Sequence, residues 1–330
     1  MIIGFDGTPC YQPSENCPIK YAYWKYRPSL AINATFTAIF SLSLIAFVIQ
    51  STAGKKWLAF TIAMALGCMV EIIGYVGRIL AHQDAFEEGP FLVQIVCLTI
   101  GPAFLAAGIY LCLSVIVVTI DSRNSRIKPM SYPKIFIPCD VISLILQAVG
   151  GGMTSVALHN NEDTATGTNI MIAGLGFQVA TMLAFILLAV DFAWRTYRNR
   201  VVLIQTVTPY HHQPSLNPSP RFKAFLVALS LSTLCIFARC VFRVAELSDG
   251  WTGKLATTQK YFVGLEGAVV AASVLLLNIC HPGFCFKAAT EPGNAQSGNR
   301  TWFSRKSSAD ESHRIGSDMM LADLRARVAK

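Results

Sequence analysis

The chain alternates long apolar runs with short polar connections. A membrane-spanning helix needs about 20 consecutive, mostly apolar residues, and seven runs reach this length. They cover residues 30–51, 57–80, 91–120, 135–158, 170–194, 223–246 and 261–281. The pattern predicts an all-α protein, a polytopic membrane bundle of seven transmembrane helices. Gly101-Pro102 lies inside the third run, where the missing amide hydrogen of proline predicts a kinked helix.

The composition agrees with a membrane protein. Of 330 residues, 53% are hydrophobic and 14% are charged, and the mean hydropathy is +0.47. A soluble domain of this size does not bury so much apolar surface. The net charge of +8 lies in connections between apolar runs, which is typical of cytoplasmic loops rather than of a nucleic-acid-binding surface. We therefore expect no nucleic-acid partner.

Positive residues are concentrated in alternate connections. The connections at 52–56, 121–134 and 195–223 hold eleven Lys or Arg residues, whereas the others are mainly acidic, with Lys254 and Lys260 as their cations. Cytoplasmic loops retain positive charge, so the amino terminus is predicted outside and the carboxyl terminus in the cytoplasm. No cleavable signal precedes the first run, which is expected to act as its own insertion signal.

Three regions follow from this topology. Residues 1–29 are expected to be an extracellular segment, 30–282 the transmembrane domain, and 283–330 a disordered cytoplasmic tail. The tail is rich in Ser, Asn and Gly, and it lacks the large apolar residues that a core requires. The spacing of apolar residues at 319–330 leaves two interpretations open, a membrane-surface helix or a frayed end.

Ionisable residues inside the spans are costly, so each calls for a role. Asp191 lies near the end of the fifth span and is expected to anchor it at the interface beside Arg195. Asp140 lies about one turn into the fourth span. It could pair with Lys134 or with a neighbouring helix.

The remaining charges are predicted to share one layer in the outer half of the membrane. At 100° per residue, those within one helix fall on one face. They are Glu71 and Arg78 with Tyr75 on the second span, Arg239, Arg243 and Glu246 on the sixth, and Glu266 on the seventh. Paired charges of this kind predict a polar cavity between these helices. The alternative is an ion-pair network that only fixes helix order.

Amides and glycines occur in the other spans. Gln94, Gln147 and Gln178 are expected to hydrogen-bond across the bundle, because an unpartnered amide is penalised in the membrane. The glycines around Gly150 and Gly174 allow either close helix approach or local unwinding, and close approach is the interpretation we prefer.

Motifs for catalysis are missing from the sequence. The six histidines fall in connections, in the tail or at helix ends, so they assemble no zinc site within the membrane. Neither a Gly-x-Ser-x-Gly elbow nor a Walker phosphate loop occurs. We expect a protein that is not an enzyme and that has no cofactor and no metal.

Four cysteines lie outside the apolar cores of the spans. Cys10 and Cys17 precede the first span, where they would either form a disulfide bond or remain free thiols. Cys280 and Cys285 follow the seventh span at the cytoplasmic interface. These two cysteines are expected either to be palmitoylated or to remain unmodified thiols.

Several short motifs occur together in a characteristic order. Glu71-Ile-Ile-Gly-Tyr-Val-Gly-Arg78 precedes Gln94 and Gly101-Pro102-Ala103. Further motifs are Asp140-Val-Ile-Ser-Leu-Ile-Leu-Gln147, Gly150-Gly-Gly152, Gly174-Leu-Gly-Phe-Gln178, Arg239-Cys-Val-Phe-Arg243-Val-Ala-Glu246 and Glu266. Together they resemble the fungal RTA-like, or lipid-translocating exporter, family over residues 11–282.

The resemblance implies a fungal plasma-membrane transporter that exports or flips sphingoid long-chain bases and confers resistance to toxic amphipaths. Its partners would be membrane lipids and amphipathic small molecules. On this hypothesis the acids would attract an ammonium head group, and the arginines would hold them ionised or bind a phosphate. The acids are Glu71, Glu246 and Glu266, and the arginines are Arg78, Arg239 and Arg243. The expected substrate path comprises Glu71, Tyr75, Arg78, Gln94, Asp140, Gln147, Gln178, Arg239, Arg243, Glu246 and Glu266.

A receptor or stress sensor without transport is the alternative function. Seven spans with the amino terminus outside and a basic tail inside are also the layout of a receptor. The seventh span lacks an Asn-Pro-x-x-Tyr motif, which favours the transporter.

Overall fold

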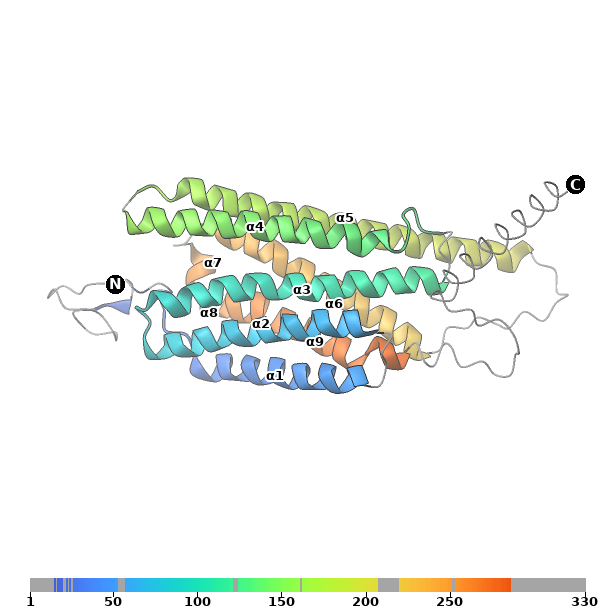
Figure 1. Ribbon diagram of the computed structural model, residues 1–330, viewed down its shortest axis with the longest axis horizontal. Helices are drawn as coiled ribbons and strands as arrows, with labels where there is room; N and C mark the ends of the chain where they lie inside the picture. The colour runs from blue at the N-terminus through green and yellow to red at the C-terminus, as the bar shows by residue number, and fades with distance from the viewer. Residues whose placement is uncertain are drawn as a thin grey trace, which may run out of the picture. The chain divides into compact units, whose positions relative to one another are not determined.

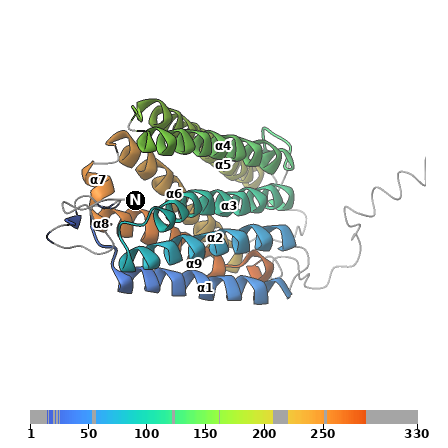
Figure 2. The same ribbon diagram turned by 60° about the vertical axis from the view of Figure 1, so that its left-hand side comes forward.

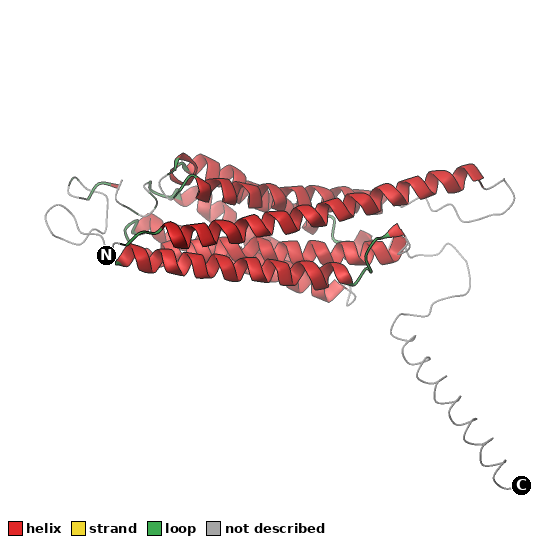
Figure 3. Cartoon of the chain, turned by 90° about the horizontal axis from the view of Figure 1, so that it is seen from above, coloured by secondary structure: helices red, strands yellow, loops and turns green. Residues whose placement is uncertain are grey.

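All regular structure in the described residues is helical (Figure 3). The computed structural model describes residues 15, 17–19, 22, 24, 26–52, 57–120, 124–160, 162–206, 220–250 and 253–285. Its elements are α1 (Leu30–Thr52), α2 (Leu58–Gln83), α3 (Glu88–Ile120), α4 (Ser131–His159), α5 (Ala165–Thr206), α6 (Pro220–Ser248), α7 (Lys254–Thr257), α8 (Gln259–Tyr261), the π-helix η4 (Phe262–Ala268) and α9 (Val269–Ile279).

Within these residues, seven helical segments are long and apolar enough to cross a membrane. They are Leu30–Ser51, Leu58–Gln83, Glu88–Ile120, Ser131–Ala157, Ala165–Asn199, Pro220–Ser248 and Gln259–Cys285. This confirms the predicted seven-helix bundle. The predicted disordered tail lies outside the described residues from 286 onward.

Helix α3 lies in the middle of the bundle (Figure 1, Figure 2). It packs against α2 on one side and α4 on the other, while α1 covers α2 and α5 pairs with α4. Helix α6 contacts α3, α5, η4 and α9. The predicted layer of charges lies on α2, α6 and η4. Helices α2 and α6 both contact α3, and η4 contacts α6.

The outer surface of the bundle is apolar. Leu42, Ile145 and Leu187 are 68%, 56% and 61% exposed, and each lies in the middle of a long helix. Exposing so many apolar side chains to water is unfavourable in free energy, whereas lipid tails are as apolar as these side chains. The chain is thus a multi-pass integral membrane protein.

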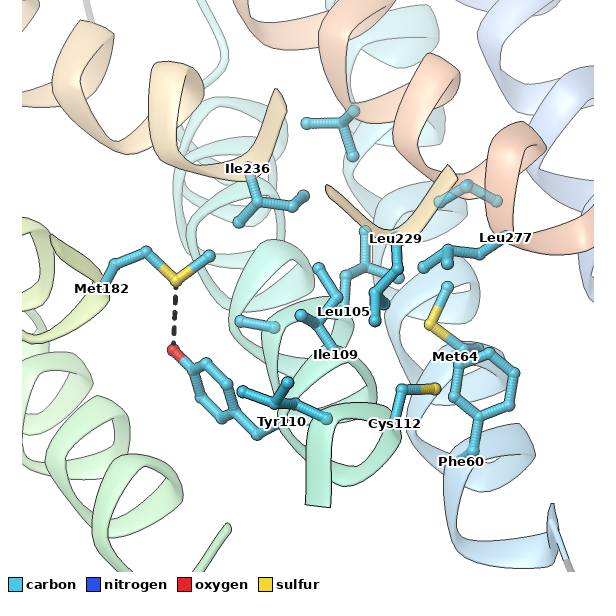
Figure 4. Packing of buried hydrophobic residues seen from close by; sticks show 14 of the residues in the cluster. Phe60, Met64, Leu105, Ile109, Tyr110, Cys112, Met182, Leu229, Ile236 and Leu277 are labelled. Atoms are coloured by element: carbon cyan, nitrogen blue, oxygen red, sulfur yellow. Dashed lines mark hydrogen bonds between the residues drawn. The ribbon is translucent and has the colours of Figure 1, made fainter. Parts of the chain in front are cut away.

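The interior between α3, α4 and α5 is filled by aromatic side chains. The Tyr110 ring lies 5.5 Å from the Phe136 ring and 4.5 Å from the Phe185 ring, measured between centroids. Its hydroxyl donates a hydrogen bond to the sulfur of Met182 at 3.3 Å (Figure 4). Polar tips of buried aromatic residues need such partners, and this one ties α3 to α5.

Helix α5 is longer than its apolar run predicts. The connection expected at 195–223 is helical as far as Thr206, so α5 has 42 residues and a length of about 63 Å. The run of apolar residues ends at residue 194, but no Gly or Pro follows before Pro209. Loss of hydropathy ends a membrane span without ending a helix, because only a breaker or a cap does that.

The end of the apolar part of α5 is held by ion pairs. Asp191 accepts from Arg195 at 3.0 Å and from Arg126 of the preceding connection at 2.9 Å. The predicted interfacial anchor beside Arg195 is confirmed. The hydrogen bond and charge of Asp191 raise the pKa of Arg126 above its ordinary value.

Candidate functional site

The seventh span changes from α-helix to π-helix and back, where the sequence predicts one regular helix over 261–281. Short helices α7 and α8 lead into η4, and the regular α-helix α9 resumes only at Val269. A π-helix has a wider turn with hydrogen bonds from residue i to i+5, and such turns occur frequently at functional sites. Glu266 lies within this wide turn.

Glycine permits the wide turn to approach α1 and α2 closely. A β-carbon on Gly267 would lie 2.6 Å from the Phe36 ring and 2.9 Å from the Tyr75 hydroxyl. No side chain fits at these distances, so the backbone of η4 contacts both aromatic residues directly. This contact fixes the depth at which Glu266 enters the bundle.

Glu266 connects η4 to α6. Its Oε1 atom lies 3.1 Å from Nη2 of Arg239, and its Oε2 atom lies 3.7 Å from Nη1 of Arg243. Arg243 also pairs with Glu246 at 2.6 Å, one turn along α6. Arg239 additionally donates to the Leu98 carbonyl of α3. The predicted pairing of acids and bases between the sixth and seventh spans is therefore present.

Glu71 of α2 lies in the same layer without joining an ion pair in the described residues. Its side chain is 2% exposed, and its Oε1 atom has no hydrogen-bond partner. It packs against Gly101, where a β-carbon would lie 2.6 Å from this oxygen. Arg239 and Glu266 are close enough to act on it electrostatically. We call Glu71, Arg239, Arg243, Glu246 and Glu266 the charge layer.

The charge layer is incompletely hydrogen-bonded. Within the described protein, partners are missing for Nε and Nη1 of Arg239, Nε of Arg243 and Oε2 of Glu266, as well as for the nearby Tyr75 hydroxyl. Buried polar groups are normally satisfied, and each exception needs an explanation. Unsatisfied donors and acceptors on both signs of charge are suited to receiving water or the polar head of an amphipath.

Arg78 does not belong to this layer, although the helical spacing placed it there. It donates to Asn33 at 3.1 Å, to Gln94 at 2.9 Å and to the Tyr26 hydroxyl at 2.9 Å, and its guanidinium carbon lies 3.7 Å from the Phe262 ring centroid. In the described residues no carboxylate pairs with it. Neutral acceptors and an aromatic face hold this buried cation instead.

The segment before α1 contributes to the cluster around Arg78 through Trp24 and Tyr26, and the sequence did not predict this contact. Trp24 donates to Gln94 at 2.7 Å and packs edge-on against Phe91 at 5.1 Å. Aromatic residues before a span are ordinarily interfacial anchors, so composition alone offered no signal. Asn33, which stands in a glycosylation sequon, is 1% exposed and hydrogen-bonded.

The other predicted path residues form a third group along α4 and α5. Gln147 donates to Gln178 at 3.2 Å, so these two amides do bond across the bundle as predicted. Asp140 lies beside Tyr110, and within the described chain no ion pair joins it to Lys134. A neighbouring helix, rather than the preceding connection, supplies its contact.

The glycines of α4 and α5 serve close packing. A β-carbon on Gly150 would lie 2.6 Å from the Met171 backbone nitrogen, and one on Gly174 would lie 3.0 Å from the Ser143 carbonyl. Helix α4 continues without interruption through residues 150–152. Close approach is confirmed, and local unwinding is not found at these glycines.

The structure describes three of the four cysteines for which a disulfide bond or palmitoylation is predicted. Cys17 is buried and disulfide-bonded, while Cys10 lies outside the described residues, so the predicted pair remains a prediction. Cys285 is 7% exposed and packs in the core, whereas Cys280 is partly exposed. Palmitoylation thus remains a prediction, with Cys280 the more accessible thiol.

The fold and its buried charges define a seven-helix integral membrane protein with a polar layer in its interior. The chain belongs to the RTA1-like family, because the model of this family, described as RTA1 like protein, matches residues 64–289. The match confirms the resemblance carried by the sequence motifs.

Several relatives occur in Saccharomyces cerevisiae. The sphingoid long-chain base transporter RSB1 is 36% identical over 281 residues, which cover 79% of this chain and 73% of the relative. Protein RTA1 is 26% identical over 289 residues, covering 79% and 85%, and Protein RTM1 is 27% identical over 233 residues, covering 70% of each. No solved structure matches the chain.

Proposed function

We propose that this protein exports sphingoid long-chain bases and related toxic amphipaths across the plasma membrane, and that it catalyses no reaction. A relative named for transport of sphingoid long-chain bases, alike over most of both chains, supports this assignment. The structural observation that carries it is the buried Glu71 carboxylate, with its unpartnered oxygen beside an incompletely satisfied charge layer.

The sign of charge in the layer favours an ammonium head group. With Arg78 held separately, three acids, Glu71, Glu246 and Glu266, face two bases, Arg239 and Arg243. When all five groups are ionised, the layer has one excess negative charge. A sphingoid base carries an ammonium group on a single long chain, so its head compensates this charge while its tail stays in apolar surroundings.

The π-helix is the element whose rearrangement would open the layer. Glu71, Arg239 and Glu266 are 2%, 0% and 3% exposed, so a head group reaches them only after the surrounding helices separate. π-turns are rare inside α-helices and occur frequently at functional sites, so the opening step we propose is conversion of η4 to a regular α-turn. Such a conversion would rotate Glu266 relative to Arg239 and free both for the substrate.

Movement of lipid by the purified protein tests the function. Vesicles containing the protein would be loaded with a labelled sphingoid base in one leaflet, and its appearance in the other leaflet would be measured against protein-free vesicles. The N-acetylated, neutral base is the control substrate, and it should move more slowly. A protein that binds the base without moving it would be the receptor or sensor, and the transport proposal would be wrong.

A further inference from the structure

A groove lies between α2 and α3, at the end of the bundle where residues 84–87 connect the two helices. It encloses about 480 Å³, a volume within the usual range of small-molecule sites. Its wall on α2 includes Ile73, Val76 and Leu80, which are 45%, 39% and 48% exposed. The charge layer occupies the opposite face of the same helix, since Glu71 is buried. The groove is therefore separate from the site described above and faces the lipid.

The groove changes from apolar to acidic along its length. Ile73 and Val76, with Val93 of α3, form the part that lies deeper in the membrane, and Asp84 and Glu87 line the mouth. Eleven residues separate Ile73 from Asp84, which corresponds to about 16 Å along a helix. This is about half the thickness of the hydrocarbon core. A single extended hydrocarbon chain anchored at the mouth would thus reach towards the middle of the bilayer.

The two acids at the mouth are available to a ligand. Asp84 uses Oδ1 to accept a hydrogen bond from the Phe86 amide at 2.9 Å, and Glu87 is exposed. In the described part of the chain, neither residue forms an ion pair. The neighbouring cation Arg27 donates to the His82 carbonyl rather than to either carboxylate. The mouth therefore presents negative charge at the level of the lipid head groups.

We propose that this α2–α3 groove binds a single-chain cationic amphipath, with the ammonium group between Asp84 and Glu87 and the hydrocarbon chain along Ile73, Val76 and Val93. Charge complementarity selects the amine, and the apolar wall open to lipid selects a long chain over a water-soluble amine. The proposal rests on the transport function proposed above and deepens it, because it assigns the site at which the substrate docks at this end of the membrane.

Photo-crosslinking of the full chain in nanodiscs of neutral phosphatidylcholine tests the groove. The probe is a sphingoid base with a photoreactive group in its chain, and the comparison probe is its neutral N-acetylated form. Cross-links of the amine should map to residues 73–93. Replacing both acids, in Asp84→Asn with Glu87→Gln, should weaken binding of the amine about tenfold and leave the neutral probe unchanged.

The chain contains a matched control for these substitutions. Asp163 also accepts a hydrogen bond through Oδ1 from the amide two residues later, at 2.9 Å, and it follows the exposed Glu162. Glu162→Gln with Asp163→Asn removes the same charge from another connection at the same end of the bundle, with asparagine keeping the acceptor in both cases. The control pair should bind the amine as the unaltered protein does. Val93→Trp, which fills the groove, should weaken binding of both probes.

The outcomes separate this proposal from the proposed function. If the protein moves the base in vesicles while cross-links map outside residues 73–93, or while groove and control variants bind equally, the groove is not the site and the transport function stands. If the amine binds in the groove with the expected charge dependence but is not moved, the groove is confirmed and the transport function is wrong.

Discussion

Arg239 and Glu266 form an ion pair between α6 and the π-helix, with Nη2 3.1 Å from Oε1 and side chains that are 0% and 3% exposed. The pair fixes the wide turn of η4 against the middle of the bundle. It also orders the charge layer, because Glu71 and Arg243 both lie within electrostatic reach of Glu266. Substitutions in this layer therefore distinguish residues that hold the fold from residues that handle substrate.

Glu266→Gln should destabilise the protein, because it leaves the Arg239 cation buried without a carboxylate. Breaking a buried ion pair from one side costs about 3–5 kcal/mol. Thermal melting of the purified protein, together with its abundance in the membrane, measures the effect. Adding Arg239→Gln removes the unpaired cation and should restore much of the stability. A single variant as stable as the unaltered protein would contradict a structural role for the pair.

Glu71→Gln should behave differently, because the Oε1 atom of Glu71 has no hydrogen-bond partner to lose. Glutamine keeps the shape of the side chain and removes its charge. We expect normal abundance and a loss of sphingoid-base movement of about tenfold or more, the equivalent of ~1.4 kcal/mol of lost charge interaction. A variant that is both abundant and fully active would show that this carboxylate takes no part in transport.

Arg78→Lys should lower thermal stability although it keeps the charge. The planar guanidinium serves three acceptors, on Tyr26, Asn33 and Gln94, in a geometry that a lysine ammonium does not reproduce. Loss of one or two such bonds costs about 1.5–3 kcal/mol each. Arg27→Lys is the control, since this exposed residue donates one bond to a backbone carbonyl. An equal melting temperature for both variants would refute the role of the cluster.

The topology prediction can be checked in intact cells. The Lys and Arg distribution places the connection between α4 and α5 outside and the carboxyl terminus inside. An epitope inserted after Glu162 should bind antibody without permeabilisation, whereas a carboxyl-terminal epitope should require it. Staining of the carboxyl-terminal epitope on unpermeabilised cells would reverse the orientation.

The disulfide prediction concerns the segment before α1, which contacts α3 through Trp24 and α2 through Tyr26. Maleimide should label Cys10 and Cys17 only after reduction. Cys17→Ser should leave Cys10 open to labelling without reductant and should lower the melting temperature, because a lost disulfide typically costs 2–4 kcal/mol. Labelling of both thiols in the unreduced protein would exclude the bridge.

The sequence alone predicted the features that depend on the lipid surroundings of the helices or on short-range contacts. Seven apolar runs of sufficient length define the spans, because a backbone in lipid must satisfy its hydrogen bonds within a helix. The anchoring of Asp191 by Arg195 and the close approach at Gly150 also follow from local rules, since each depends on one helix or one neighbour. The length of α5 was underestimated, because hydropathy marks the edge of the membrane and not the end of a helix.

The tertiary structure decided which polar residues meet. Helical spacing places Glu71 and Arg78 on one face of α2, but seven residues of rise carry Arg78 about 10 Å along the axis, into the reach of Tyr26 and Gln94. The π-turn of η4 changes the rotation of every residue after it, so no regular periodicity predicts where Glu266 points. Sequence determines which side chains are too polar for lipid, whereas the rotation and offset of packed helices determine their partners, because those depend on close packing of the whole interior.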